Sequence, residues 1–291
     1  MKPFPFEYRI AETTEEAVTL LADEGSEAKI IAGGQSLGPM LNYHLVRPDY
    51  LIDINRATEL NCIVEEGGFL RIGATATEVD IENSALVRQH VPLLVTATTH
   101  IGFPSIRHRG TIGGSVAHND PAAEYPATLL ALDAMFDVVS LRGRRTLSAT
   151  DLFADRFLET TADVDEMIVG VAIPISTPTM RPGFAEFQER AGDFATAGVS
   201  TVLTMNEAGN QIVSAAIAAF GGLYPARLRA AEDALAGAEP SVETFSEAAA
   251  AVGAEFAVGS DVHGSARYRR RLIEALAKRA LAEAAALQPT G

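Results

Sequence analysis

Residues 101–126 read IGFPSIRHRGTIGGSVAHNDPAAEYP, and two adjacent glycines stand at the centre of this stretch. Glycine adopts positive φ without a steric cost and lets a ligand approach the main chain closely. Successive N–H groups in such a turn form a concave site for an anion. We therefore expect 102–121 to be a glycine-punctuated loop, with Thr111-Ile112-Gly113-Gly114-Ser115 facing a negatively charged group.

A second Gly-Gly turn lies earlier in the chain, at Ala32-Gly33-Gly34-Gln35-Ser36-Leu37. The short apolar run 29–31 leads into it as a strand, and the Ser36 hydroxyl offers a further donor. Taken alone, each turn is more often only a structural turn than a binding site. Neither turn has the G-x-G-x-x-G dinucleotide pattern or the P-loop pattern, so both of those folds are disfavoured.

The charge balance limits the partners of this chain. The formal net charge is −15 over 291 residues. Such an excess of acid argues against nucleic acid or an anionic membrane surface as a partner. Any phosphate must therefore be held locally, by backbone N–H groups and a few placed cations. The length fits two domains or one large domain.

The chain has one cysteine, Cys62. One thiol cannot form an intramolecular disulfide, and it cannot hold an iron–sulfur cluster alone. The polar start of the chain lacks the apolar region of a signal peptide. No apolar run approaches the ~20 residues that span a bilayer. We expect a cytoplasmic protein.

Periodicity in the first half predicts an alternation of helices and short strands. Thr13 and Glu16 have the spacing of a capping box at the start of a helix. The expected helices are 13–24, 78–100 with a break before Pro92, and 122–132. The expected strands are 29–31, 51–54, 69–74, 135–141 and 167–173.

Turn-forming residues at 176–183 predict a domain boundary near 175. Beyond it, 184–187 is extended and 190–193 is a loop. The apolar runs 198–205 and 212–220 predict a hairpin that turns at 206–210. Helices are expected at 228–236, 241–256 and 265–286. Because strands cluster within each half, the fold class is α+β.

The stretch 101–126 closely resembles a signature of the molybdenum hydroxylase flavoproteins. These are the FAD-binding medium subunits typified by carbon monoxide dehydrogenase, and the matching FAD domain of xanthine dehydrogenase. Further matching segments occur in order along nearly the whole chain: 32–37, Arg47-Pro48, 51–54, Ile72-Gly73-Ala74, 190–195 and Tyr268-Arg269-Arg270.

This resemblance implies a fold and its division into domains. Residues 1–175 would form the two-subdomain FAD-binding fold of the vanillyl-alcohol-oxidase (PCMH) type, with subdomains at about 1–55 and 56–175. Residues 176–291 would form a small α+β C-terminal domain, an antiparallel sheet with helices.

The resemblance also implies a set of FAD-binding residues. The pyrophosphate would lie on the two Gly-Gly segments. Glu124 would contact the adenosine part, with His118 and Asp120 on the same loop. Ile168 would pack on the cofactor, and Asp193 and Phe194 would lie near the isoalloxazine. The expected cofactor-binding residues are Ala32, Gly33, Gly34, Gln35, Ser36, Leu37, Thr111, Ile112, Gly113, Gly114, Ser115, His118, Asp120, Glu124, Ile168, Asp193 and Phe194, with no catalytic residue and no metal ligand.

Structural interpretations stand beside three of these residue assignments and beside one further cluster. Asp120 is equally well placed to cap a helix that has Pro121 in its first turn. Glu124 has the character of an ordinary first-turn acid. Phe194 is as compatible with the core as with a flavin contact. The arginines of 267–271 are typical of a solvated helix face.

The function that the resemblance implies is electron relay. A large subunit with the molybdopterin cofactor would oxidise the substrate. A small subunit with two [2Fe-2S] clusters would pass electrons to FAD on this chain, which would deliver them to an external acceptor. An (LMS)2 heterohexamer of large, medium and small subunits is expected. The alternatives are a stand-alone FAD-dependent reductase of related fold, such as the cell-wall enolpyruvyl sugar reductases, and a non-catalytic nucleotide-binding module.

Overall fold

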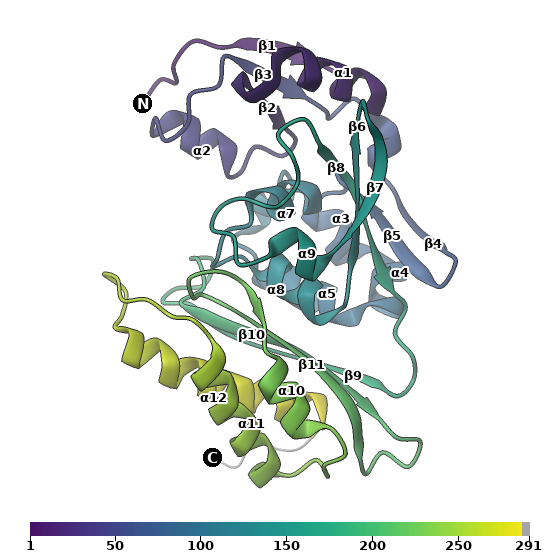
Figure 1. The fold of residues 1–291 in the computed structure, drawn as a ribbon, viewed down its shortest axis with the longest axis vertical. Helices are drawn as coiled ribbons and strands as arrows, with labels where there is room; N and C mark the ends of the chain where they lie inside the picture. Colours follow the sequence, from purple (N-terminus) through teal and green to yellow (C-terminus); the bar gives the residue numbers. More distant parts are fainter. Residues whose placement is uncertain (287–291) are drawn as a thin grey trace.

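The structure is a computed structural model, and it describes residues 1–286. Three sheets follow one another along the longest axis of the molecule (Figure 1). The first and smallest sheet is built by the N-terminal segment, the second by the middle of the chain, and the third by the C-terminal part. The architecture is α+β, as the sequence predicted. No helix in this part of the chain is both long enough and apolar enough to cross a bilayer.

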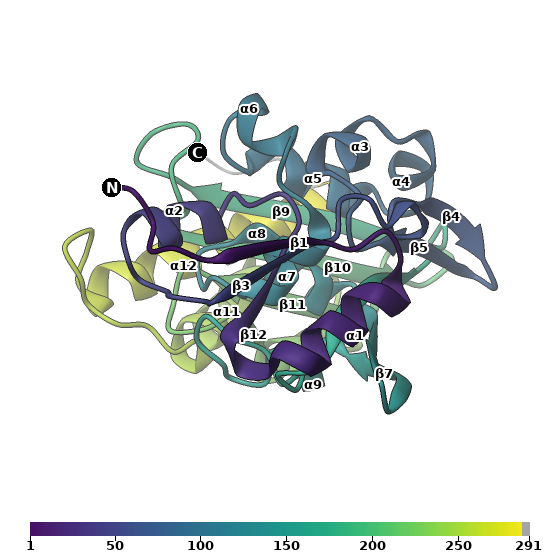
Figure 2. The same cartoon turned by 90° about the horizontal axis from the view of Figure 1, so that it is seen from above.

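The first sheet has three parallel strands in the order β1-β3-β2. Seen from above, α1 and α2 lie on either side of the strands (Figure 2). Thr13 caps α1, because its side chain accepts from the N–H of Glu16. The Glu16 carboxylate accepts from the N–H of Glu12 rather than from Thr13. The elements are β1 (Glu7–Ile10), α1 (Thr14–Glu24), η1 (Gly25–Glu27), β2 (Ala28–Ile31), α2 (Leu37–Asn42), β3 (Tyr50–Asp53) and η2 (Thr58–Leu60).

The second sheet has five antiparallel strands in the order β4-β5-β8-β6-β7. Its strands are β4 (Ile63–Glu66), β5 (Phe69–Gly73), β6 (Met135–Ser140), β7 (Gly143–Ser148) and β8 (Met167–Pro174). Its helices are α3 (Glu78–Asn83), α4 (Ala85–His90), α5 (Pro92–His100), α6 (Pro104–Arg107), α7 (Ile112–His118), α8 (Glu124–Ala131) and α9 (Ala149–Phe153).

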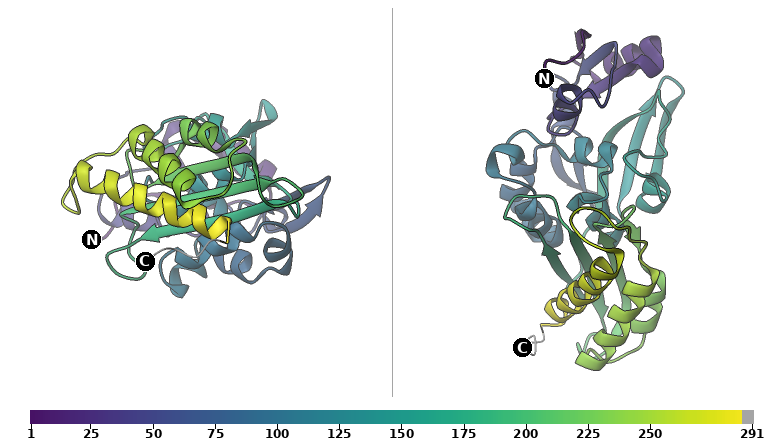
Figure 3. Two further views of the ribbon diagram at one scale, coloured as in Figure 1. Left: turned by 90° about the horizontal axis from the view of Figure 1, so that it is seen from below. Right: turned by 90° about the vertical axis from the view of Figure 1, so that its left-hand side faces the viewer.

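The third sheet has four antiparallel strands in the order β12-β11-β10-β9. Three helices cover one of its faces, as the view from below shows (Figure 3). The strands are β9 (Met180–Phe187), β10 (Ala197–Met205), β11 (Ile212–Phe220) and β12 (Ala226–Arg227), and the helices are α10 (Arg229–Leu235), α11 (Val242–Glu255) and α12 (Ala266–Ala284).

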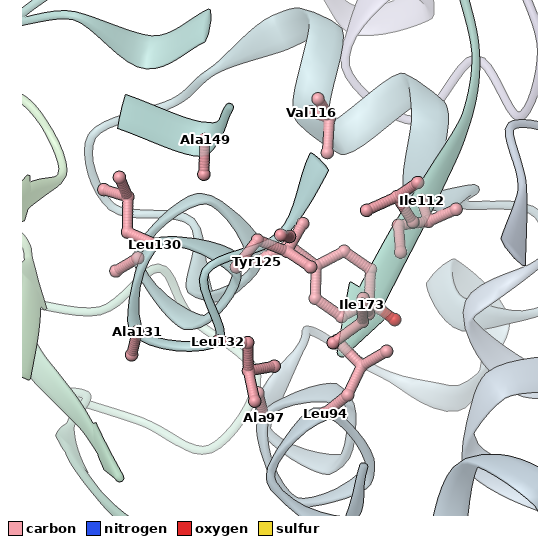
Figure 4. Packing of buried hydrophobic residues seen from close by; sticks show 14 of the residues in the cluster. Leu94, Ala97, Ile112, Val116, Tyr125, Leu130, Ala131, Leu132, Ala149 and Ile173 are labelled. Atoms are coloured by element: carbon pink, nitrogen blue, oxygen red, sulfur yellow. The ribbon is translucent and has the colours of Figure 1, made fainter. Parts of the chain in front are cut away.

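The third sheet is buried on both faces, which explains its long apolar strands. On β10, Val199 and Leu203 point toward the helices α10–α12, whereas Val202 points toward the second sheet's core. Helix α8 covers that second face, and every one of its residues is buried. A helix that is mostly apolar and buried on all sides is typical of such a central position. Figure 4 shows Tyr125 of α8 packed among Leu94, Ile112 and Ile173.

The predicted loop 102–121 is wrong in one respect, because α6 and α7 lie within it. The Gly-Gly pair at 113–114 stands in the first turn of α7 rather than in an open turn. The predicted break before Pro92 is confirmed, and a second break occurs at Ser84, which caps α4. The predicted helix 122–132 begins later, at Glu124, with Ala123 at the N-cap.

Several strands have no apolar pattern, and the sequence did not predict them. The side chains of β1 are all exposed, and β4 and β7 are mostly exposed edge strands. Strand β9 begins at Met180, inside the segment expected to be a turn-rich boundary. Pro182 is tolerated there because β9 is an edge strand, which needs hydrogen bonds on one side only.

Candidate cofactor-binding site

The first Gly-Gly loop joins the end of β2 to the start of α2. Ala32, Gly33, Gly34, Gln35 and Ser36 form the loop, and Leu37 is the first residue of α2. Gly34 has a φ of +71°, which favours glycine. A Cβ at Gly33 would overlap the carbonyl oxygen of Arg109, so the loop packs directly against the turn that precedes α7.

Four consecutive N–H groups of this loop have no protein acceptor within residues 1–286. They belong to Gly33, Gly34, Gln35 and Ser36. The Ser36 side chain also makes no capping hydrogen bond. A row of unpaired N–H groups at the end of a strand is typical of an anion site. Free N–H groups are what an anion site requires, and anion binding at this loop stays a prediction.

The second Gly-Gly segment differs from the first, because its N–H groups already have acceptors. Those of Ile112 and Gly113 donate to the carbonyl oxygens of Ala76 and Ala74, at 3.1 and 3.0 Å. Thr111 caps α7, since its side chain accepts a hydrogen bond from the N–H of Gly114. Its carbonyl oxygen accepts from the N–H of Ser115. The expected nest of free N–H groups is thus absent from this segment as the structure describes it.

Close packing explains the first glycine of that pair. A Cβ at Gly113 would lie 2.6 Å from both the Cβ and the carbonyl oxygen of Ala74. A Cβ at Gly114 would meet only the Thr111 hydroxyl, at 3.0 Å. Thr111 also forms a β-bridge with Thr77. Three segments that are distant in sequence therefore converge here: 32–36, 73–77 and 109–115.

Two of the predicted apolar contacts lie behind these segments. Ile112 is 1% exposed, and its side chain belongs to the core. Ile168, on β8, is 9% exposed and lines a small apolar pocket with Ala74, Gly113 and Val116. Ile168 therefore stands directly beside the start of α7, and Ile112 lines the same pocket.

The end of α7 carries the predicted pair His118 and Asp120. The His118 Nε2 lies 3.7 Å from the Asp120 Oδ2. Burial lowers the pKa of His118, and Asp120 opposes this shift. The Asp120 Oδ1 accepts from the N–H of Ala122, in a turn before the helix. The alternative in which Asp120 caps a helix beginning at Pro121 is therefore wrong.

Glu124 belongs to a group of buried acids. It is the first residue of α8 and is 6% exposed. Burial and the neighbouring Glu186 raise the pKa of Glu124 well above its usual range. Burial also raises the pKa of Glu186 to about 7, against a hydrogen bond from Gln188. Glu78, beside Gly110, has its pKa raised to about 7 by burial, against the opposing charge of Arg107.

The predicted flavin-side residues Asp193 and Phe194 lie in the loop between β9 and β10. Both are exposed, and Phe194 is 71% exposed, so the interpretation of Phe194 as a core residue is wrong. Gln188 links this loop to the end of α5, because its side-chain amide donates to the carbonyl oxygen of His100 at 3.0 Å. It also accepts from the N–H of Gly192.

Two family models match the chain in sequence. The model described as FAD binding domain in molybdopterin dehydrogenase matches residues 4–176, and the model described as CO dehydrogenase flavoprotein C-terminal domain matches residues 183–284. This chain is an FAD-binding medium subunit of the molybdenum hydroxylase family. It is accordingly a subunit of a molybdenum-dependent oxidoreductase, and the PCMH-type fold expected from the sequence is confirmed.

Curated relatives match this medium subunit from end to end. The nicotine 6-hydroxylase medium subunit of Paenarthrobacter nicotinovorans is 41% identical, over 98% of this chain and 99% of its own length. The 6-hydroxypseudooxynicotine dehydrogenase complex subunit alpha of the same organism is 39% identical, over 98% and 96%. A solved structure of carbon monoxide dehydrogenase from Hydrogenophaga pseudoflava superposes with a TM-score of 0.95, at 36% identity, over 98% of this chain and 99% of that chain.

Two residues of the medium subunit have roles that the sequence did not indicate. Asn55 donates from its amide to the carbonyl oxygen of Ala32, at 3.0 Å. Arg269 is 7% exposed rather than solvated like its neighbours Arg267, Arg270 and Arg271. Its guanidinium donates to the carbonyl oxygens of Thr196 and Gly221. For Asn55 the only signal was its place just after the strand 51–54, and Arg269 lies within a matched family segment.

Proposed function

We propose that this chain is the electron-relay subunit of a molybdenum hydroxylase complex. It would accept electrons from the [2Fe-2S] clusters of a partner and deliver them to an external acceptor. FAD, when bound, supplies the redox chemistry, and the protein supplies position, burial and hydrogen bonds. The observation that carries the proposal is the match of both family models, which together span residues 4–176 and 183–284.

The first Gly-Gly loop fits the pyrophosphate of FAD. Its four unpaired N–H groups, from Gly33 to Ser36, provide donors without a basic field, which suits a chain of net charge −15. Arg109 lies close enough to the end of β3 to lower the pKa of Asp53. We place the phosphates against this loop, between Ala32, the Ser36 hydroxyl and the first residue of α2, Leu37.

The start of α7 would form the opposite wall of the same site. The backbone from Thr111 to Ser115 closes on 73–77, and the space outside Gly114 is open apart from the Thr111 hydroxyl. We propose that this wall contributes close approach and the positive end of a short helix rather than additional free N–H groups.

We propose roles for the remaining predicted residues on both sides of this centre. Glu124 would contact the ribose of the adenosine part, the role that the family resemblance gives it, at the start of α8. His118 and Asp120 would border the same part of the cofactor. Ile168 would pack against it from β8, and the exposed Asp193 and Phe194 would lie near the isoalloxazine, where Phe194 offers a ring face for stacking.

The proposed partners are a large subunit with the molybdopterin cofactor and a small subunit with two [2Fe-2S] clusters, in an (LMS)2 heterohexamer. The names of the relatives support a multi-subunit setting, because they include medium chains and a complex subunit. The single Cys62 agrees with clusters held by another chain, since such clusters need several thiolates. The proposed domains are residues 1–175, with subdomains at about 1–55 and 56–175, and residues 176–291. Residues 287–291 of the second domain lie outside the described part.

The experiment is affinity purification of the tagged full-length chain from its native cells. We expect a yellow protein that brings down two further subunits, molybdenum, and about four iron atoms per FAD, the content of two [2Fe-2S] clusters. Anaerobic addition of the complex's substrate should bleach the flavin absorbance, and an acceptor should restore it. A colourless chain without partners would contradict the relay function. A lone yellow chain that oxidises NADPH with a sugar nucleotide would favour the reductase.

A further inference from the structure

Asn55 stands behind the first Gly-Gly loop and holds one of its carbonyl groups. Its Nδ2 donates to the carbonyl oxygen of Ala32 at 3.0 Å. The same amide donates to the Oδ1 of Asp53 at 2.6 Å, and the Asn55 N–H donates to that oxygen at 2.8 Å. Asp53 therefore fixes both the backbone and the side chain of Asn55.

Asp53 is itself held in place at the end of β3. Its Oδ2 accepts from the hydroxyl of Tyr8, on the neighbouring strand β1, and its carbonyl oxygen accepts from the N–H of Ala11. Burial alone would raise the pKa of Asp53, but the hydrogen bonds from Tyr8 and Asn55 outweigh it and lower the pKa. The carboxylate thus stays charged and keeps accepting at neutral pH.

The planarity of the peptide bond transmits this arrangement to the loop. In a trans peptide the C=O of one residue and the N–H of the next point in opposite directions. Because the carbonyl of Ala32 points toward the Asn55 amide, the N–H of Gly33 points away from Asn55. Gly33 N–H is the first of the four donors that have no protein acceptor within residues 1–286.

We infer that Asn55 is a positioning residue for phosphate binding, which orients the N–H of Gly33 through the carbonyl of Ala32. This inference rests on the proposed FAD site. Asn55 itself does not touch the phosphates. Its amide is required because a carboxylate at this position has no proton for the Ala32 carbonyl and would repel Asp53.

The test compares Asn55→Ala and Asn55→Asp with wild type in the full-length chain, purified with the partner subunits it retains and freed of flavin. FAD is titrated back and followed by quenching of its fluorescence. Loss of the hydrogen bond to Ala32 should weaken FAD binding about tenfold in Asn55→Ala, and more in Asn55→Asp. The phosphorus NMR signals of bound FAD should also move in Asn55→Ala.

The matched control is Asn61→Ala, which removes another exposed asparagine side chain with no hydrogen bond in this structure. It should leave FAD affinity and the phosphorus signals unchanged. The melting temperature of the flavin-free protein should be the same in all variants. Wild-type FAD affinity in Asn55→Ala would overturn the inference alone. A weaker FAD affinity that comes with a lower melting temperature and with unmoved phosphorus signals would also overturn it. Failure of the wild type to bind FAD would remove the proposed function and the inference together.

Discussion

Glu78 carries a buried carboxyl whose Oε2 has no hydrogen-bond partner in this structure. Burial raises its pKa to about 7 from an ordinary 4.5. The folded state therefore binds this proton more tightly than the unfolded state does. The resulting stabilisation is complete below about pH 4.5 and is lost as pH rises through 7. For Glu78→Gln, which stays neutral, the free energy of unfolding should rise relative to wild type by up to about 3 kcal/mol over this range.

Denaturant unfolding of both proteins from pH 4.5 to 8 measures this difference. Glu247→Gln, which changes an exposed carboxylate of α11, serves as the control and should show no such trend. A constant difference between Glu78→Gln and wild type across the range would show that the Glu78 carboxyl has the same pKa in the folded and the unfolded protein.

Arg269 holds three loops at one end of the third sheet. Its guanidinium donates to Thr196 and Gly221 at 2.7 and 2.9 Å and pairs with Asp261 at 2.6 Å. Arg269→Ala should lower the free energy of unfolding by about 3 kcal/mol, because two buried carbonyl groups lose their donor. The exposed neighbour Arg270→Ala should change it by less than about 0.5 kcal/mol. Equal effects of the two substitutions in urea titrations would contradict the described role of Arg269.

Among the helices, the two glycines at the start of α7 are expected to differ in how well they tolerate a side chain. Gly113→Ala forces a methyl group against Ala74, and it should cost about 1–3 kcal/mol of stability. Gly114→Ala brings a methyl group to 3.0 Å from the Thr111 hydroxyl and from no other atom, and alanine favours a helix by up to about 1 kcal/mol over glycine, so it should cost less stability than Gly113→Ala. If FAD lies outside Gly114, this same substitution should weaken FAD binding.

Thermal unfolding of the flavin-free protein, together with FAD titration, separates these two effects. A loss of stability in Gly114→Ala as large as that in Gly113→Ala would mean that Gly114 is as closely packed as Gly113. Unchanged FAD affinity in Gly114→Ala would instead place the cofactor away from this turn.

The elements also show where sequence patterns are informative. The hairpin of β10 and β11 was predictable, because most residues of both strands are apolar and buried. Strand β1 (EYRI) was not predictable, because all its side chains are exposed and only its pairing with β3 makes it a strand. Helix α7 was missed because two glycines weaken helix propensity, while the Thr111 cap and tertiary packing override them.

At the candidate site, too, a local sequence pattern predicts only what local interactions cause. The free N–H groups of the first Gly-Gly loop were predictable, because they follow from a local pattern, a strand followed directly by two glycines. The second segment has a similar sequence, but its N–H groups are engaged by Ala74 and Ala76, which lie far away in sequence. Asn55 and Arg269 likewise act through partners that no local pattern reveals.

At the scale of the whole molecule, the third sheet and helix α8 are joined by a buried hydroxyl pair. The Thr128 Oγ1 and the Ser200 Oγ are 2.8 Å apart, and both residues are fully buried. Removing one hydroxyl leaves the other without its partner, whereas removing both leaves neither unpaired. Thr128→Val and Ser200→Ala should each cost about 1–3 kcal/mol, and the double variant should cost less than their sum by about 1 kcal/mol or more. Chemical unfolding of all four proteins gives this coupling energy directly.

Because the core around α8 is continuous with that face of the sheet, the four proteins should each unfold in one transition across both regions. Simple additivity, or a separate transition for the third sheet, would mean that the C-terminal part is only loosely attached to the cofactor-binding part.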